Sequence, residues 1–372
     1  MVTNRVSPAR SRSLGPRGWF LIALVALFGL EFALRAFGFG YVVGSEASAR
    51  YGWRMLPEQA VVHADTGIET RTNALGFRDR EWGEPAPDPT HLRVAWLGNS
   101  MIWGGNRIRV EQRCDRQLEE LAARRPADGG GARPLLSMNF AQPGYTFEQM
   151  ARVWEDLVRP FRPDVLIVPL CAYDIRPMRA SIDRVHYPFW RTIESSALFD
   201  LYKRMAGGGW HPELAREELD VELSVVDDPF APEHLLLRIE LDARVEEVLA
   251  QARELGTRVI VVALPTLADL TEPERRWFGD HWAAWCAEHG VEYVDPRPRF
   301  RTAMQPLFDE LATKGLTPQD VWGRFIDHSR AATLETRLAA CFHFDDPTHF
   351  TARGHLALAD ALVDAVLRAG AR

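Results

Sequence analysis

From residue 93 onward, short runs of apolar residues alternate with longer stretches in which apolar residues recur every three or four positions. The short runs, at 93–97, 135–140, 164–170, 258–264 and 291–294, predict β-strands. Strands that are apolar throughout are typical of parallel sheets covered on both faces. We therefore predict an α/β fold, a three-layer α/β/α sandwich around a central, mostly parallel five-stranded sheet that spans residues 93–372.

The stretches between these runs predict amphipathic helices. The pattern places helices at 233–255, 272–289 and 352–368, and the first two are followed by Gly256 and Gly290, the residue favoured just past a helix end. Two shorter helices each carry an apolar face, formed by Val110, Cys114, Leu118 and Leu121 in one and by Phe147, Met150, Val153 and Leu157 in the other. Residues 176–232 break the alternation, and we expect an insertion there, either a lid or substrate wall or an ordinary loop with packed aromatic residues.

The N-terminal part has a different pattern. Residues 1–17 contain arginines and no acidic residue, and residues 18–39 are mostly apolar, about the ~20 residues that a membrane-spanning helix needs. Glu31 and Arg35 interrupt this run at a spacing that lets them pair on a helix. The basic flank predicts a cytoplasmic N-terminus, a single-pass membrane anchor and a remainder outside the cytoplasm, in the periplasm or at the cell exterior. A signal peptide cleaved near 36–38 is the alternative. Residues 40–92 would connect the anchor to the first core strand.

Composition narrows the possible partners. The chain of 372 residues is 47% hydrophobic and carries a net charge of −7, without a long basic run after the N-terminal segment. Nucleic-acid binding depends on clustered Lys and Arg, so we expect no nucleic-acid partner. The four cysteines are widely spaced, without a pair that suggests a zinc or redox site. We expect them to be buried small apolar side chains, with a disulfide still open for a domain outside the cytoplasm.

Polar residues that suit chemistry follow the predicted strands. Ser100 comes directly after the first strand, Gly144 lies after the second, and residues 171–174 follow the third. Asp346 and His349 stand just before the last helix. Because ligands in parallel sheets bind beyond the carboxyl ends of the strands, we expect these residues to gather at one edge.

The three-residue offset lets the Asp346 carboxylate reach Nδ1 of His349 and leaves Nε2 free for Ser100. That arrangement of nucleophile, base and orienting acid activates a hydroxyl group that is otherwise a weak nucleophile. The backbone N–H groups of Ser100 and Gly144 are candidate oxyanion donors. Asp345 is the alternative acid. A metal site made of His343, His349, His355 and the two aspartates is disfavoured by the spacing, and we expect no metal and no cofactor.

These residues resemble the motifs of the SGNH (GDSL-type) hydrolases, in the bacterial subgroup with an N-terminal membrane anchor, over most of residues 70–370. The segment 73–79 resembles that subgroup's sequence before the core, and Gly98-Asn99-Ser100 is similar to the first family block. Gly144 corresponds to the second block, and Asp346-Pro347-Thr348-His349, followed by Gly354-His355, to the last. The resemblance implies the flavodoxin-like SGNH hydrolase fold and a serine esterase acting on small-molecule, glycan or lipid esters.

Two positions depart from the family pattern. Asn99 stands where Asp is usual, at a position outside the triad. Tyr173, in Cys171-Ala172-Tyr173-Asp174, stands where the family has an oxyanion-hole Asn, so Tyr173 is an expected donor with a longer arm or a filler of the cleft floor. We expect Asp174 to be a structural hydrogen-bond acceptor. Two alternatives remain beside the esterase: an O-acyltransferase acting on envelope glycans, and a catalytically impaired binding module of the same fold.

Overall fold

A five-stranded parallel sheet forms the centre of the molecule. The computed structural model describes residues 15–37, 44–63, 66–105, 107–125, 133–178, 196–205, 225, 228–272, 274–275, 277–321, 340–343 and 346–370. The sheet has the order β6-β5-β7-β8-β9, and each neighbouring pair is parallel. Its strands are β5 (Leu92–Trp96), β6 (Leu135–Asn139), β7 (Val165–Leu170), β8 (Arg258–Ala263) and β9 (Glu292–Val294).

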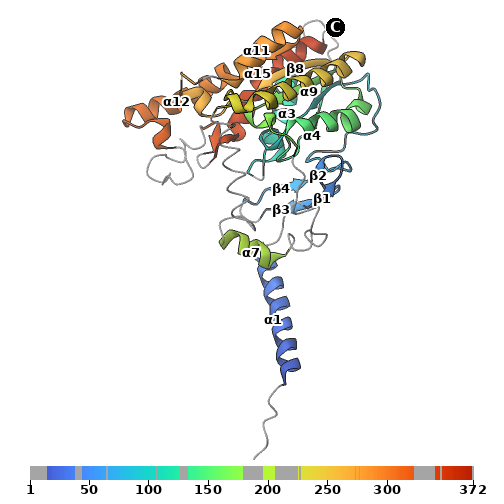
Figure 1. Ribbon diagram of the computed structural model, residues 1–372, viewed down its shortest axis with the longest axis vertical. Helices are drawn as coiled ribbons and strands as arrows, with labels where there is room; N and C mark the ends of the chain where they lie inside the picture. The colour runs from blue at the N-terminus through green and yellow to red at the C-terminus, as the bar shows by residue number, and fades with distance from the viewer. Residues whose placement is uncertain are drawn as a thin grey trace, which may run out of the picture.

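Helices cover both faces of this sheet (Figure 1). One face packs against α3 (Cys114–Arg124), α12 (Arg297–Thr313) and α15 (Ala352–Gly370). The other face packs against α4 (Phe147–Val153), α9 (Leu235–Glu254) and α11 (Phe278–His289). Successive strand residues serve opposite faces, since Val94 and Trp96 join the first core while Ala95 and Leu97 join the second. The predicted three-layer α/β/α fold is confirmed.

Two helices differ from the sequence prediction. The helix expected at 272–289 begins later, at Phe278 in α11, and a separate short helix, α10 (Ala268–Thr271), precedes it with Glu272 as its C-cap. Glu272 precedes a proline, which disfavours the helical conformation of the residue before it, and its backbone is extended. The second difference is α12, which the strand and helix pattern did not include, and which carries Pro306 inside its length.

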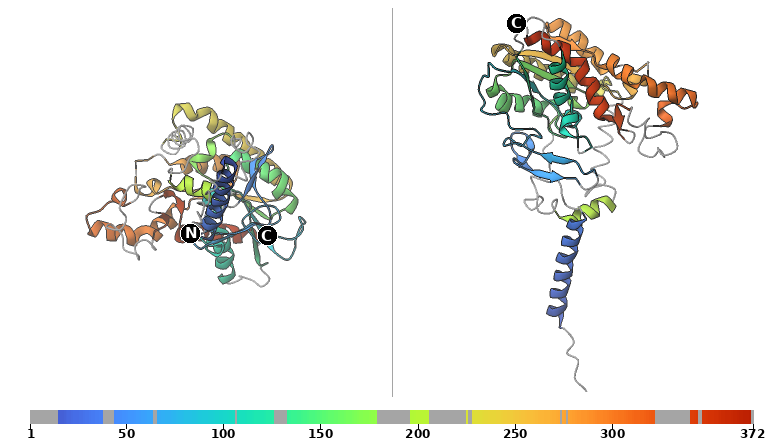
Figure 2. Two further views of the ribbon diagram at one scale, coloured as in Figure 1. Left: turned by 90° about the horizontal axis from the view of Figure 1, so that it is seen from below. Right: turned by 180° about the vertical axis from the view of Figure 1, so that it is seen from behind.

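Residues 44–92 form structure rather than a plain connector. Strand β1 (Ser45–Ser48) pairs with β2 (Gly52–Met55), and β3 (Ala60–Val62) pairs with β4 (Glu69–Arg71), both antiparallel. These hairpins lie between the central domain and the N-terminal helix (Figures 1 and 2). They are tied to the domain through α4 and the turn before it: the Tyr145 hydroxyl donates to the Trp53 carbonyl at 2.6 Å, and Gln149 Nε2 donates to the Tyr51 carbonyl at 2.7 Å.

The N-terminal helix α1 (Pro16–Ala36) projects away from the domain (Figure 2). Its mean hydropathy is 1.9 and none of its hydrophobic window is buried. Beside its end lies α7 (Ala197–Met205), which belongs to the insertion predicted at 176–232. Most of that insertion, and residues 1–14, lie outside the described residues. The remaining short elements are α2 (Ser100–Trp103), β10 (Phe342–His343) and β11 (Asp346–Phe350).

Candidate active site

A tight turn at the carboxyl end of β5 presents Ser100. Asn99 is the N-cap of α2, and its side-chain Oδ1 accepts a hydrogen bond from the Met101 amide at 3.0 Å. Gly98 precedes it because no side chain fits: a Cβ there would lie 2.6 Å from Cβ of Ile102, which is fully buried. The turn therefore lifts the serine out of the sheet and fixes it at the first position of a short helix.

His349 and Asp346 reach this serine from the other end of the chain. Both lie on β11, which pairs with β10 in an antiparallel hairpin. His349 Nε2 is 2.8 Å from Ser100 Oγ, and His349 Nδ1 is 2.7 Å from Asp346 Oδ2. The structure thus brings together all three residues expected to form the triad, in the order hydroxyl, imidazole, carboxylate. The alternative acid, Asp345, lies outside the described residues.

The Asp346 carboxylate is held in its ionised form. Burial by itself raises a carboxyl pKa, but the hydrogen bonds from His349 and Thr348 outweigh it and place the pKa of Asp346 well below its usual range. The Thr348 hydroxyl donates to Asp346 Oδ1 at 2.7 Å, and the His349 amide approaches the same oxygen at 3.3 Å. An ionised carboxylate in this position fixes the imidazole with a proton on Nδ1, so that Nε2 can accept the Ser100 proton.

A cavity of about 370 Å³ opens over these side chains. This volume is at the small end of the range for pockets that bind small molecules. Its wall is mainly apolar, and part of it comes from the hairpin region, through Met55 and His63. The full lining among described residues is Met55, His63, Ser100, Met101, Trp103, Gly104, Gly105, Arg107, Pro143, His343, Asp346, His349, Phe350 and His355.

Two backbone amides are suited to hold a developing oxyanion. Gly144 adopts φ +77°, a conformation that favours glycine, and follows Pro143, which lines the cavity. The turn is tied to the nucleophile, because the Gln142 amide donates to the Gly98 carbonyl at 3.1 Å. Within the described chain, the amides of Ser100 and Gly144 make no hydrogen bond to a protein acceptor. Ser100 lines the cavity, and Gly144 directly follows Pro143, which also lines it.

Tyr173 has a different placement from these donors. It lies in the 3-10 helix Ala172–Ile175 and packs at the edge of the core that contains Trp96. The guanidinium carbon of Arg176 is 3.2 Å from the centroid of its ring. Tyr173 is not among the described residues that line the cavity. The structure therefore brings Ser100 and the Gly144 turn to the cavity wall and leaves Tyr173 outside it.

Sequence reasoning missed a network of buried charged side chains, Arg78 and Asp79, that supports the turn carrying Ser100, called here the nucleophile turn. Arg78 Nη2 donates to the Ile108 carbonyl at 2.7 Å, and its Nη1 donates to the Trp103 carbonyl at 3.2 Å. The neighbouring Asp79 accepts the Asn139 amide at 3.0 Å, which links the segment to β6. Arg78 is 1% exposed, so these bonds are shielded from water. A signal was present: an Arg-Asp pair directly after the apolar Leu75-Gly76-Phe77.

The remaining histidines and cysteines have other surroundings. His355 is fully buried, its Nδ1 accepts the Cys114 amide at 3.2 Å, and burial lowers its pKa to about 3, so the ring is neutral. Among the described residues there is no group of three or more His, Cys, Asp or Glu side chains that could hold a metal ion. All four cysteines are buried and free.

Comparison with known proteins identifies the family. Solved structures that this chain matches include a catalytic mutant of an acetylxylan esterase from Geobacillus stearothermophilus, with 14% identity, a TM-score of 0.40, and coverage of 76% of this chain and 94% of that one. A GDSL-like lipase from Bacteroides thetaiotaomicron has 12% identity, a TM-score of 0.34, and coverage of 76% and 91%. No curated protein sequence matches this chain at a significant level. The profile of the GDSL-like Lipase/Acylhydrolase family matches residues 96–357, well over half of the chain, and the chain therefore belongs to this family of ester-hydrolysing enzymes.

Proposed function

We propose that this enzyme is a membrane-anchored, extracytoplasmic serine esterase that uses Ser100 as nucleophile, His349 as general base and acid, and Asp346 as orienting acid. The observation that carries the proposal is the continuous contact from Asp346 through His349 to Ser100, at 2.7 Å and 2.8 Å. Distances of this size are within reach for proton transfer from the serine to the imidazole.

In the first half of the reaction, Ser100 Oγ attacks the acyl carbon while His349 Nε2 takes its proton. The carbonyl oxygen becomes an oxyanion, which the amides of Ser100 and Gly144 stabilise. The C–O bond to the alcohol then breaks, and His349 returns the proton to the leaving alkoxide. The product of this half is an acyl group on Ser100.

In the second half, His349 takes a proton from a water molecule that attacks the acyl carbon. The carboxylic acid leaves, and the proton returns to Ser100. The same residues would pass the acyl group to a sugar hydroxyl in place of water. The cavity of about 370 Å³ suits a short acyl chain, and we propose short-chain esters of carbohydrate or lipid alcohols as the substrate class.

The anchoring is supported by α1. It has 21 residues, a mean hydropathy of 1.9 and side chains that the rest of the protein leaves exposed. A core helix of a soluble protein would bury such a surface. The basic residues before α1 favour a cytoplasmic N-terminus, and the catalytic domain would lie on the far side of the inner membrane.

Labelling with a serine-directed fluorophosphonate probe tests the triad. The detergent-solubilised wild-type chain should be labelled, Ser100→Ala should not, and His349→Asn should be labelled far more slowly because the hydroxyl group loses its base. Circular dichroism establishes that each variant is folded. A folded wild-type chain that resists the probe would contradict the esterase and favour a binding module.

Two further measurements define the reaction and the location. The hydrolysis rate should be compared for 4-nitrophenyl esters with acyl chains of 2, 4, 8 and 16 carbons. We expect it to be highest for the short chains and to fall steeply for the longer ones. Acyl transfer to an added oligosaccharide, in preference to water, would identify an acyltransferase. An alkaline phosphatase fused to the C-terminus should be active in intact bacteria only if the domain lies outside the cytoplasm.

A further inference from the structure

Glu31 is a carboxylate in the C-terminal third of an apolar helix, and its contacts reach outside that helix. In α1 it pairs with Arg35, whose Nη2 lies 2.8 Å from Glu31 Oε1. The same oxygen accepts the Ala197 amide at 2.9 Å. The other oxygen accepts the Ser196 hydroxyl at 2.9 Å and the Leu198 amide at 3.0 Å. Both oxygens are therefore engaged, and three of the donors belong to the start of α7.

These bonds also provide acceptors for the first backbone amides of α7. The first amides of any helix have no acceptor within the helix, and inside a bilayer there is no water to take that role. Glu31 accepts two of these amides, so the start of α7 has bonding partners without water. Conversely, a carboxylate within a membrane span needs partners, and α7 supplies them. Each element satisfies groups that the other would leave exposed to lipid.

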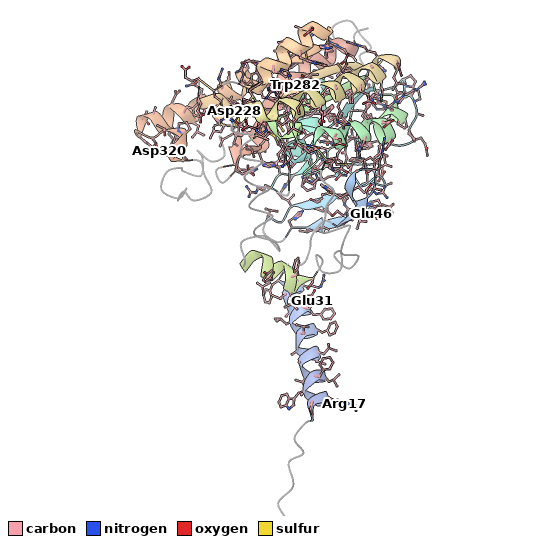
Figure 3. The ribbon with its side chains drawn as sticks, viewed as in Figure 1. Arg17, Glu31, Glu46, Asp228, Trp282 and Asp320 are labelled. Atoms are coloured by element: carbon pink, nitrogen blue, oxygen red, sulfur yellow. The ribbon has the colours of Figure 1, made fainter. Side chains whose placement is uncertain are left out.

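The position of Glu31 along α1 sets the depth in the bilayer at which it contacts α7. At 1.5 Å per residue, Glu31 lies about 18 Å along the helix from Trp19, the aromatic residue at the cytoplasmic end. The hydrocarbon core of a bilayer is about 30 Å thick, and Trp is enriched at its boundaries. With Trp19 at the inner boundary, Glu31 falls within the outer leaflet. Figure 3 places Glu31 where α1 meets α7.

The two described aromatic side chains of α7 suit contact with lipid, although the helix also carries three charged residues. The helix has the sequence Ala-Leu-Phe-Asp-Leu-Tyr-Lys-Arg-Met. The rings of Phe199 and Tyr202 stack with their centroids 6.1 Å apart, and Tyr202 is 47% exposed. An exposed aromatic side chain on a short helix beside a membrane span is suited to contact lipid.

We propose that α7 lies in the outer leaflet of the membrane, clamped to the spanning helix through Glu31, so that the lipid interface is its partner. This proposal rests on the membrane anchoring proposed above. It assigns a function to α7: the domain is attached to the bilayer at a second place, separated from α1 in sequence by β5, β6 and β7 of the sheet.

Spin labels report the depth of single positions in proteoliposomes of phosphatidylethanolamine and phosphatidylglycerol. Three cysteine variants of the full chain are compared: Tyr202→Cys on α7, Val25→Cys on the lipid side of α1, and Glu246→Cys on the exposed face of α9. The native cysteines are buried, which limits background labelling. We expect the labels at 202 and 25 to collide mainly with oxygen, which partitions into lipid, and the label at 246 to collide mainly with a water-soluble nickel chelate.

The outcomes separate the two proposals. If position 25 is in lipid and position 202 is in water, α7 is not in the membrane and this inference is wrong. If position 25 is itself in water, the membrane anchoring fails and the inference fails with it.

The clamp is tested by Glu31→Leu in the Tyr202→Cys background. Loss of the acceptor should move the label toward water and raise its mobility, whereas Glu31→Gln, which keeps one acceptor oxygen, should have a smaller effect. Val25→Leu is the matched control and should change neither reading. A label at 202 that stays at the same depth in Glu31→Leu would overturn the role of Glu31, and circular dichroism establishes that the domain remains folded.

Discussion

The side-chain amide of Asn99 donates a hydrogen bond to the carboxyl group of Asp174, with Nδ2 3.2 Å from Oδ1. Asn99 caps the helix that begins with Ser100, and Asp174 lies in the loop after β7. The other oxygen of Asp174 accepts the Cys171 amide at 2.8 Å. Both side chains are buried. This pair therefore couples the nucleophile turn to the third motif of the site through the protein interior.

Replacing Asp174 with Asn should change how stability depends on pH. Burial raises the pKa of Asp174 to about 7, whereas an aspartate in the unfolded chain titrates near 4. The folded state holds this proton more tightly, so its contribution to stability is present below about pH 4 and is lost as the pH rises to 7, by about 4 kcal/mol. Asp174→Asn removes this loss. The free energy of unfolding, measured with urea, should differ less between pH 5 and pH 8 for the variant than for the wild type. An equal difference in the two proteins would contradict this expectation.

Replacing Asn99 with Asp, the usual residue of the family at this position, should be harmful in this chain. It would set two carboxylates against each other in the interior, where like charges resist joint ionisation. We expect a destabilisation of about 3 kcal/mol and a fall in kcat that grows as the pH rises from 6 to 8. The double variant Asn99→Asp with Asp174→Asn restores one donor and one acceptor and should recover most of the activity. No recovery would mean that the two positions act independently.

The nucleophile turn should tolerate no side chain at Gly98. In Gly98→Ala the new Cβ would lie 2.6 Å from Cβ of Ile102, a contact that backbone movement must relieve. Forced overpacking of this kind costs about 1–3 kcal/mol, and movement of the turn displaces Ser100 from His349, so kcat should fall by about 100-fold. Gly256→Ala, at φ +72° with no atom within 4 Å, is the control for backbone strain without a clash, and it should leave kcat unchanged. Equal kcat values for the two variants would exclude this role for Gly98.

The sheet could be predicted from sequence because its strands are buried on both faces. Every residue of β5 and of β7 is buried, and this appears in the sequence as runs that are apolar except for Arg93. The hairpins of residues 45–71 lacked such a signal. Strands of three or four residues are too short for a periodic pattern, and contacts distant in sequence, such as the bond from Tyr145 to Trp53, hold them in place.

The polar residues of the candidate site could be located because parallel strands end at one edge. That rule placed Ser100 near Asp346 and His349 from sequence alone, although 249 positions separate Ser100 from His349. The contacts that hold these residues in place could not be located by the same rule. The bonds of Arg78 to the carbonyls of Trp103 and Ile108 depend on where two loops pass each other, and the Arg-Asp pair at 78–79 marks the segment without identifying these partners.

The role of Tyr173 can be separated from that of the backbone donors with Tyr173→Phe. The ring packs against Arg176 and is not among the described residues that line the cavity, so we expect kcat to remain within about threefold of the wild type. Loss of a true oxyanion donor typically costs about 10²–10³ in kcat, which would be easily detected. A loss of that size, with KM unchanged, would assign the hydroxyl group to the oxyanion hole and contradict our expectation.

The assignment of the acid can be decided with a matched pair of adjacent residues, Asp345→Asn and Asp346→Asn. Asp346 Oδ2 contacts His349 Nδ1 at 2.7 Å, and its amide replacement would favour the wrong imidazole tautomer. We therefore expect Asp346→Asn to lower kcat by about 10³–10⁴ with little change in KM, and Asp345→Asn to stay within a few-fold of the wild type.

The stability of Asp345→Asn and Asp346→Asn in acid gives a second, independent measurement of which aspartate pairs with His349. Because the pKa of Asp346 lies well below its usual range in the folded state, its contribution to stability is present above about pH 4 and is lost as the pH falls further. Asp346→Asn should therefore flatten the decline of the unfolding midpoint between pH 5 and pH 3, and Asp345→Asn should not. The reverse result in both measurements would make Asp345 the partner of His349 and reassign the triad.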